Sequence, residues 1–370
     1  MSKQILNLIE PTLFDQTGHG YSYVHSLLTA NQTFPFAAHV WLDKRGAGLL
    51  SDSLCTTHAY FWRPLRQVQK VFLYVKLLMQ ANIIFVCTSD LWDLKLLAFY
   101  AQLFKSKSKI FLHFHQFKQT NKKLAALRKL AGNEYVTILA PTEKLLNVFR
   151  GAGFVNCHVV PCPTFAPPQG SAPRSHTLGV LGGDDKIKVL YAGAARSDKG
   201  FPLVVQLLQD LRRRNIDVPF EVQISTPNSQ RYDHATESAL QTLRAIPTHN
   251  LTLHEHTLDQ SQYLNLFNNA ICLLLYDQSG YNDKFSGVTL DAFYAGCPII
   301  TIQDTWMGDT AVKYDAGIAL ANYELATIEA AINKILNNYA HYHANAKAAA
   351  QQLRDLHDPK NTLQNIYDSI

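Results

Sequence analysis

Short apolar runs rich in β-branched residues alternate with helix-length segments along most of this 370-residue chain, and no other feature limits its fold as strongly. The pattern is typical of parallel sheets whose strands are connected by covering helices. Strands are expected at 5–9, 38–42, 83–87, 110–115, 137–140, 157–160, 188–192, 220–225, 251–254, 271–276 and 298–301. Helices are expected at 21–30, 64–80, 93–104, 121–131, 142–152, 201–214, 234–245, 260–268 and 287–295, with one long helix from Leu325 onward. The sequence therefore predicts an α/β protein built from doubly wound parallel sheets.

One segment interrupts this series. Residues 163–183 contain four prolines and four glycines, a composition that excludes regular structure and favours a linker. We therefore expect an N-terminal domain at 1–165, a linker at 166–186, a second domain at 187–338 and a C-terminal helix at 339–370 that is able to pack back on the first domain. In open parallel sheets, ligands bind beyond the carboxyl ends of the strands, so the site is expected where two such edges face each other across a cleft.

Composition excludes several other classes of protein. Hydrophobic residues make up 47% of the chain and charged residues 17%, so the chain can bury large cores and is not disordered. No stretch approaches about 18 uninterrupted apolar residues, and the apolar run at the N-terminus is too short for a signal peptide, which favours a cytoplasmic protein. The six cysteines show no C-x-x-C pair and no histidine at zinc spacing, so we expect free buried thiols rather than disulfides or a structural zinc.

Charge is divided unevenly between the two halves. Residues 1–165 hold 18 Lys and Arg against 8 Asp and Glu, whereas residues 166–370 hold 16 against 21. The basic half is either an ordinary solvated face or attracts an anionic partner, such as a membrane surface, a phosphorylated carrier or a nucleic acid. Nucleic acid is disfavoured because the chain shows no helix-turn-helix, zinc finger or aromatic strand motif.

Residues 60–80 mix aromatic side chains with cations. An interfacial helix at the inner face of an anionic membrane needs this mixture, with rings at headgroup depth and cations on the lipid phosphates. An amphipathic helix of an ordinary core has a similar pattern, so the sequence leaves both interpretations open.

The first candidate site is the loop 191–202. A buried strand is expected to end at Gly193, where the loop presents Arg196 and Lys199 before Gly200 leads into a helix. Glycine permits close approach to the backbone, and two cations beside a helix N-terminus suit a diphosphate. Many strand-to-helix loops contain Gly and Lys, so this loop alone does not define a function.

The second candidate site is the segment 283–301. Asp283 and Asp291 are eight residues apart, and Ser286-Gly287 opens a helix whose first amides, including those of Val288 and Thr289, lie at its positive end. Carboxylates at this position can accept hydrogen bonds from sugar and ribose hydroxyls while the amides hold phosphate. In the alternative interpretation, Asp283 is a helix cap and Asp291 a partner of the helix dipole.

Together the two segments resemble the group 1 (family 4) glycosyltransferases of GT-B fold, which are retaining and use nucleotide-sugars. Residues 193–200 resemble the family's G-R-x-x-x-x-K-G loop, and residues 283–300 resemble its E-G-F-G-x-x-x-x-E-A-x-A-x-G-x-P-V-V motif. The likeness is good over about 188–320 and only topological in the first half. It implies a GT-B architecture, with two doubly wound Rossmann-like domains facing across a cleft.

The resemblance implies roles for the donor-side residues. Lys199 would neutralise the donor diphosphate, with Gly193 opening the loop. The family arginine follows that glycine directly, but Ala194 occupies its position here, so Arg196 would substitute from two residues further on.

In the second motif, both family glutamates are replaced by aspartates. Asp283 matches the acid that contacts the transferred sugar, and Asp291 matches the acid that binds the ribose. The amides of Gly287 and Val288 match those that hold the phosphates, and Thr289 follows them.

In the first domain, the glycines Gly18 and Gly20 resemble the family's acceptor-side loop. This loop is not a dinucleotide fingerprint, because Tyr23 stands where the last glycine should be. At the end of the expected strand 110–115, His115 is the better match to the family histidine that faces the donor sugar, and His113 is the fallback. Both side chains would lie on one face of the strand.

The expected function is therefore transfer of a sugar from a UDP- or GDP-sugar to a saccharide, lipid-linked or protein acceptor, with retention of configuration. The nucleotide-sugar is a substrate, and neither a cofactor nor a metal is expected. The enzyme would be cytoplasmic, either throughout or also at the inner face of the membrane. The alternatives are a catalytically degenerate GT-B protein that acts as a binding subunit and a GT-B nucleotide-sugar epimerase.

Overall fold

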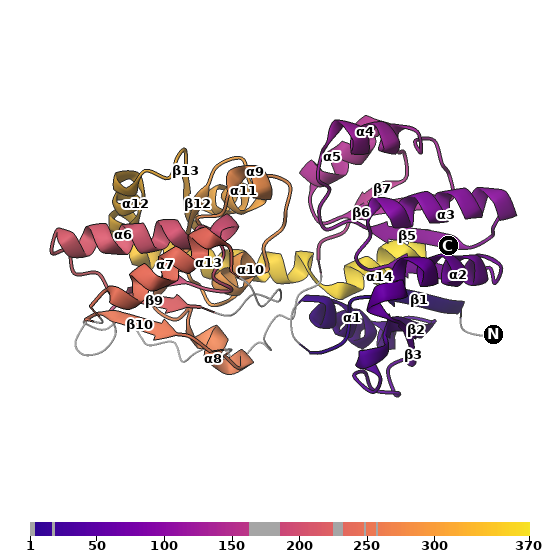
Figure 1. Cartoon of the computed structure of the whole chain (residues 1–370), viewed down its shortest axis with the longest axis horizontal. Coiled ribbons are helices and arrows are strands. Elements are labelled where there is room, and N and C mark those ends of the chain that lie inside the picture. Colours follow the sequence, from indigo (N-terminus) through magenta and orange to yellow (C-terminus); the bar gives the residue numbers. More distant parts are fainter. Residues whose placement is uncertain (1–3, 17–18, 163–185, 225–231, 248, 257) are drawn as a thin grey trace. The chain divides into compact units, whose positions relative to one another are not determined.

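The computed structural model describes residues 4–16, 19–162, 186–224, 232–247, 249–256 and 258–370 (Figure 1). The chain divides into two compact units. Unit 1 comprises Met1–Phe165, Asp283–Phe285 and Leu356–Ile370, and unit 2 comprises Ala166–Asn282 and Ser286–Asp355. The expected linker at 166–186 lies outside the described residues except for Lys186.

Unit 1 is built on a parallel sheet of seven strands in the order β3-β2-β1-β4-β5-β6-β7. The order reverses direction beside β1, which pairs with both β2 and β4. The strands are β1 (Gln4–Glu10), β2 (Phe36–Asp43), β3 (Thr56–Phe61), β4 (Ile83–Val86), β5 (Lys109–His113), β6 (Val136–Ala140) and β7 (Cys157–Val159). This is the doubly wound topology that the alternating pattern predicts.

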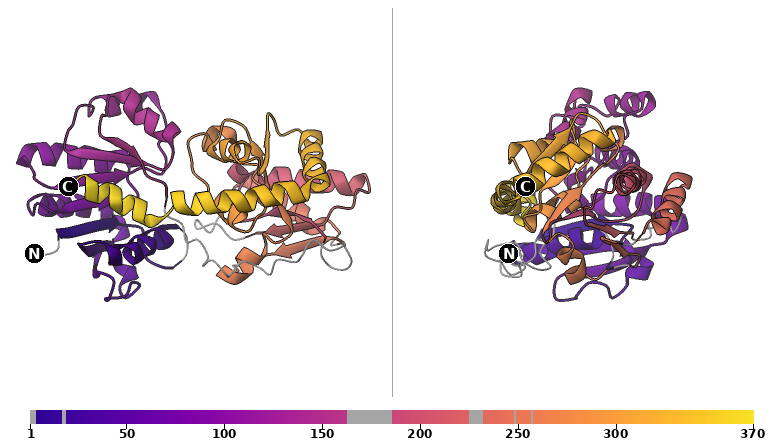
Figure 2. Two further views of the ribbon diagram at one scale, coloured as in Figure 1. Left: turned by 180° about the vertical axis from the view of Figure 1, so that it is seen from behind. Right: turned by 90° about the vertical axis from the view of Figure 1, so that its left-hand side faces the viewer.

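Helices cover both faces of this sheet (Figures 1 and 2). They are α1 (His19–Ala30), α2 (Arg66–Leu78), α3 (Leu91–Phe104), α4 (Asn121–Arg128), α5 (Glu143–Ala152) and α14 (Pro359–Asp368). One core lies under α2, α3 and α5, and a second lies under α1 and α14. Thr142 caps α5, because its side chain accepts a hydrogen bond from the amide of Leu145.

Unit 2 has a parallel sheet of six strands in the order β10-β9-β8-β11-β12-β13. Its strands are β8 (Lys188–Tyr191), β9 (Phe220–Gln223), β10 (Leu251–His254), β11 (Ala270–Leu273), β12 (Ile299–Ile302) and β13 (Gly317–Leu320). Its helices are α6 (Phe201–Arg213), α7 (His234–Ala245), α8 (Gln260–Asn265), α9 (Gln278–Tyr281), α10 (Gly287–Tyr294), α11 (Trp306–Lys313), α12 (Leu325–Asn337) and α13 (Tyr339–Leu356). A single large cluster of buried residues spans β8, β9, α6, α7 and α12.

The structure differs from the sequence-based expectation at several elements. The expected long helix from Leu325 onward is three helices, α12, α13 and α14, of which α14 and the last residue of α13 belong to unit 1. The segment 60–80 is not one helix, because its first two residues complete strand β3. The pattern also missed α11 and β13.

Two findings bear on the expected class of protein. Within the described residues, no helix is long and apolar enough to cross a membrane. All six cysteines are buried free thiols, as their spacing predicts.

Candidate functional site

The loop after β8 is shaped by two glycines in the left-handed region of backbone space. Gly193 has a φ of 108°, and its amide donates a 2.7 Å hydrogen bond to Oε1 of Gln223 at the end of β9. Gly200 has a φ of 76°, and a Cβ built on it would lie only 2.0 Å from the carbonyl oxygen of Leu275. The loop therefore packs directly on the chain that leaves β11, at a distance that only glycine allows.

Lys199 is the last residue of the short helix η4 (Ser197–Lys199) within this loop. Its Nζ atom lies 5.4 Å from the centre of the Tyr276 ring, and a Cβ built on Gly193 would be 3.6 Å from it. Burial lowers the pKa of Lys199, and the nearby Arg196 guanidinium lowers it further. None of the ion pairs among the described residues includes Lys199. A poorly hydrated cation of this kind gains strongly from an anionic ligand.

Arg196, by contrast, already has a carboxylate partner. Its Nε atom donates a 2.8 Å hydrogen bond to Oδ1 of Asp198, and a second nitrogen contacts Oδ2 of the same carboxylate. The guanidinium side chain is 44% exposed. A diphosphate would have to compete with Asp198 for Arg196, whereas Lys199 offers its charge directly.

The N-terminus of α10 supplies further donors at the same edge of the sheet. Ser286 occupies the N-cap position without a side-chain cap hydrogen bond, so the amides of Gly287 and Val288 are among the orphan donors of the helix. A Cβ built on Gly287 would have no heavy atom within 4 Å, so the space beside this residue is open. Thr289 differs, because its amide donates to the Ser286 carbonyl (3.2 Å) and its side chain is fully buried.

Topology brings this helix end and the loop after β8 to one edge. Strand β11 pairs with both β8 and β12, and α10 connects β11 to β12. Because the strands are parallel, the loop after β8 and the N-terminus of α10 both lie at the carboxyl edge of the sheet. The structure thus groups Gly193, Arg196, Lys199, Gly287 and Val288 in one region of unit 2.

Asp291 lies further along α10 and is held by a tyrosine that the sequence analysis missed. The Tyr263 hydroxyl, from α8, donates a 2.9 Å hydrogen bond to Oδ2 of Asp291. Burial raises the pKa of Asp291 to about 6, although this hydrogen bond favours the charged form. The spacing of the motif gave no signal for Tyr263, because the contact joins helices that are distant in sequence.

Asp283 belongs to unit 1 and not to unit 2. The chain joins unit 1 for three residues, Asp283–Phe285, and the Phe285 ring lies 5.2 Å from the ring of His357. The Asp283 carbonyl accepts a 3.2 Å hydrogen bond from the Thr142 hydroxyl. Asp283 is 7% exposed, and burial raises the pKa of its carboxyl. The two aspartates of the second motif therefore lie in different units.

The two candidate histidines at the end of β5 have different surroundings. His113 is fully buried, and its Nδ1 atom lies 2.5 Å from the Tyr23 hydroxyl. His115 lies just beyond the strand and is partly exposed, with its Nε2 atom 2.8 Å from the Cys87 carbonyl oxygen. The rings lie on the same side, with centroids 4.6 Å apart, as the strand spacing predicts. Burial of His113 leaves His115 as the better placed of the two for contact with a ligand.

A cysteine joins these two histidines in a group that could hold a metal. Within the described residues, one ligand atom from each of His113, His115 and Cys162 lies within 4.8 Å of the other two, and the Cys162 Sγ atom is 3.4 Å from Nδ1 of His115. Imidazole nitrogen with thiolate suits zinc or copper. Burial raises the pKa of Cys162, which opposes formation of the thiolate that such a metal requires.

The acceptor-side glycines fall at the start of α1. Gly18 lies outside the described residues. Gly20 is in the first turn of α1, where a Cβ would be 3.9 Å from the Glu10 side chain at the end of β1. Tyr23, which breaks the dinucleotide fingerprint, is buried beside His113 and so has a structural role.

Comparison with known proteins shows the class of fold. Over 99–100% of its length the chain superposes on solved structures that include a glycosyltransferase from Rickettsia africae ESF-5 (TM-score 0.73, 11% identity, 99% of that chain). Anabaena Alr3699/HepE in complex with UDP is also similar (TM-score 0.69, 16% identity, 100% of that chain). So is the sucrose-phosphate synthase of Thermosynechococcus elongatus (TM-score 0.68, 14% identity, 98% of that chain). The two parallel-sheet α/β domains confirm the predicted GT-B fold class.

Sequence comparison adds a likeness to one family. Residues 180–352, slightly less than half of the chain, match the family described as glycosyl transferases group 1, which is the group that the two motifs resemble. The glycogen synthase of Mycobacterium tuberculosis is 26% identical over 167 residues, which are 45% of this chain. The match spans only 38% of the length of that relative.

Proposed function

We propose that this chain transfers a sugar from a nucleoside diphosphate sugar to a hydroxyl group of a saccharide, lipid-linked or protein acceptor, with retention of anomeric configuration and without a metal ion. The observation that carries the proposal is the partly buried ammonium of Lys199, which forms no ion pair among the described residues and lies at the same sheet edge as the first amides of α10, within the segment that matches the glycosyltransferase family. Anabaena Alr3699/HepE was solved with UDP and with UDP-glucose, which makes uridine nucleotides the first probes for this chain.

The proposed chemistry assigns a role to each of these groups. When the bond between the sugar C1 and the diphosphate breaks, its electron pair goes to the leaving diphosphate. Lys199 and the amides of Gly287 and Val288 would stabilise this growing charge, because fixed donors need no reorganisation during the reaction. The acceptor oxygen forms the new bond to C1, and its proton goes to the departing diphosphate. Asp283 and His115 would contact the transferred sugar, and Asp291 the ribose.

Release of nucleoside diphosphate tests the proposal. The full chain is incubated with a nucleotide-sugar in EDTA, with and without candidate acceptor sugars, and both the diphosphate and the sugar products are measured. We expect diphosphate release that an acceptor accelerates, together with a product of retained configuration. Isomerised nucleotide-sugar formed without diphosphate release would indicate an epimerase. Binding without turnover for every acceptor would favour the binding-subunit alternative.

Replacement of Asp283 separates sugar transfer from nucleotide binding. Asp283→Asn keeps the shape of the side chain and the backbone hydrogen bond from Thr142, so the fold should be preserved. We expect kcat with a UDP-sugar to fall by at least about tenfold, while the Kd of UDP changes less than about twofold, because UDP lacks the sugar. Equal losses in UDP binding and in transfer would contradict a contact between Asp283 and the sugar.

Binding of the donor should weaken in acid because of Asp291. Its carboxyl must be charged to accept hydrogen bonds from both ribose hydroxyls, and its pKa is raised to about 6. The affinity for UDP-glucose should therefore fall by roughly tenfold from about pH 7.5 to pH 5. UDP-glucose is the right probe, since its diphosphate is esterified at both ends and does not take up a proton in this range.

Two comparisons make this pH test specific. Asp291→Asn should bind UDP-glucose weakly at every pH, with a flat profile, whereas a profile as steep as that of the wild type would contradict the assignment.

Protonation of Asp291 does not destabilise the folded protein, so unfolding caused by this group would not explain weaker binding in acid. A carboxyl whose pKa is higher in the folded than in the unfolded state stabilises the fold when it is protonated, and this stabilisation is lost as the pH rises through about 6.

A further inference from the structure

Helices α2 and α3 of unit 1 carry large apolar side chains on the faces that they turn to solvent, as well as on those that cover the sheet. Fifteen large apolar side chains are exposed among the described residues, and nine of them lie between residues 62 and 104. A monomeric protein rarely leaves such a group uncovered unless it binds something. We call this surface, formed by the outward sides of α2 and α3 with Trp62 and Leu65, the α2–α3 face.

On α2 the exposed apolar residues form a stripe. Val68, Phe72 and Met79 follow the spacing of one helix side and are 55%, 67% and 74% exposed. The opposite side packs into the core through Leu73 and Leu77, which are 1% exposed. The helix is therefore apolar on both sides, which an ordinary amphipathic surface helix is not.

Helix α3 repeats this arrangement beside α2. Trp92, Phe99 and Leu103 lie on one side of the helix and are 44%, 59% and 59% exposed. A buried ion pair joins the two helices, with Nζ of Lys70 on α2 at 2.7 Å from Oδ1 of Asp93 on α3. The exposed stripes therefore lie on two helices that contact each other and share a buried ion pair. Figure 1 shows α2 and α3 beside each other in unit 1.

Positive charge surrounds this face. Residues 62–109 contain eight Lys and Arg but only two Asp, and one of the aspartates, Asp93, is neutralised by Lys70. The remaining cations are exposed or partly exposed: Arg63, Arg66, Lys76, Lys95, Lys105, Lys107 and Lys109. Interfaces between proteins are depleted in lysine, whereas membrane surfaces attract basic residues through anionic headgroups.

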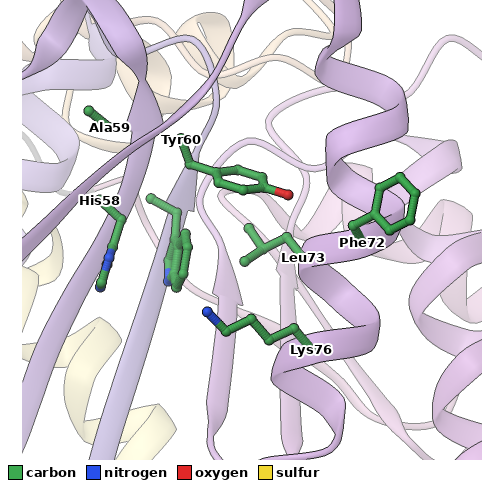
Figure 3. Close-up of a pocket in the computed structure, with 7 residues that line it drawn as sticks. His58, Ala59, Tyr60, Phe72, Leu73 and Lys76 are labelled. Carbon is green, nitrogen blue, oxygen red and sulfur yellow. The ribbon is translucent and has the colours of Figure 1, made fainter.

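A pocket of about 420 Å³ borders the α2 stripe. It lies between α2 and the strand β3, where Figure 3 shows Lys76 extending from the helix toward the strand that carries His58. The Nζ atom of Lys76 is 5.3 Å from the centre of the Trp41 ring. A cation and aromatic rings at the rim of an apolar surface are the groups that contact the headgroup region of a bilayer.

We propose that the α2–α3 face docks on a lipid bilayer that contains anionic lipids, with Phe72, Met79 and Phe99 among the acyl chains and the basic residues at the phosphates. The sequence analysis considered only the segment 60–80 for this role. The structure supplies a second stripe on α3 and a buried ion pair that joins the two helices. The docking does not rest on the proposed sugar transfer, because its test requires no nucleotide.

Flotation of the full chain with vesicles tests the docking. We expect binding to phosphatidylcholine vesicles that contain phosphatidylglycerol to exceed binding to pure phosphatidylcholine by at least about tenfold, since each basic residue near the surface adds about 1 kcal/mol. This binding should weaken with added salt. The fluorescence of Trp62 and Trp92 should shift to the blue and be quenched by brominated lipids. Equal binding to both vesicles, or no binding, would overturn the proposal.

Paired variants show whether this face is responsible. Phe72→Ser/Phe99→Ser removes exposed rings only, so the fold should be unaffected, and binding should fall by about tenfold or more. Val155→Ser is the matched control, because Val155 is also in unit 1, is 84% exposed and lies outside the face. Unchanged flotation of the double variant would contradict the proposal. A wild-type dimer that becomes monomeric in the double variant, without any binding to vesicles, would identify a protein interface instead and would also overturn it.

Discussion

Lys199→Ala should lower kcat/KM for the nucleotide-sugar by about 100-fold, because loss of a fixed donor at a developing negative charge has effects of this size. Lys199 is poorly hydrated and lies between Gly193 and the Tyr276 ring, and among the described residues it forms no ion pair that would compete with a diphosphate. Arg196→Ala should cost much less, since its guanidinium is already bound to Asp198. Steady-state kinetics of the variants measure both effects.

Two further variants control this experiment. Lys199→Arg retains the charge and should recover part of the activity. Lys334→Ala removes an exposed lysine of α12 in the same unit and should be indistinguishable from the wild type. A wild-type rate for Lys199→Ala, with an unchanged circular dichroism spectrum, would contradict the assignment of this loop to the diphosphate.

Gly200→Ala should reduce the free energy of unfolding by about 3 kcal/mol or more. A Cβ at this position would lie 2.0 Å from the Leu275 carbonyl oxygen, and overpacking of this kind typically costs about 1–3 kcal/mol. The left-handed backbone, with a φ of 76°, adds about 1–2 kcal/mol for any residue with a side chain. Urea denaturation followed by circular dichroism measures the loss.

A second glycine separates the two causes. Gly48 has nearly the same backbone conformation, with a φ of 78°, but a Cβ built on it would have no heavy atom within 4 Å. Gly48→Ala should therefore cost only about 1–2 kcal/mol. If Gly200→Ala were no more destabilising than Gly48→Ala, the close packing of the loop on the chain beyond β11 would be wrong.

Local signals in the sequence predicted much of unit 2 closely. The helix α7 and the strand β10 have the bounds expected for them, His234–Ala245 and Leu251–His254. A short apolar run marks the strand, and Asp233 caps the helix by accepting a hydrogen bond from the amide of Thr236. Where such signals were weak, elements were missed. The edge strand β3 has no apolar run, because most of its residues are exposed or partly exposed.

Contacts between distant segments could not be predicted from spacing. The motif 283–301 reads as one continuous site, yet Asp283–Phe285 join unit 1 while the helix that follows belongs to unit 2. The hydrogen bond from Tyr263 to Asp291 depends on how α8 packs, which no local pattern encodes. For the same reason, residues 93–104 read as an ordinary helix, and its exposed side was recognisable only from the structure.

Binding of the donor nucleotide tests the central claim most directly. The thermal unfolding of the full chain and of Lys199→Ala is measured in EDTA with UDP, GDP, ADP, CMP and the common nucleotide-sugars. We expect one nucleoside diphosphate and its sugars to raise the Tm of the wild type clearly, and the Tm of Lys199→Ala much less. No shift with any nucleotide, or an equal shift in both proteins, would contradict a diphosphate site at Lys199.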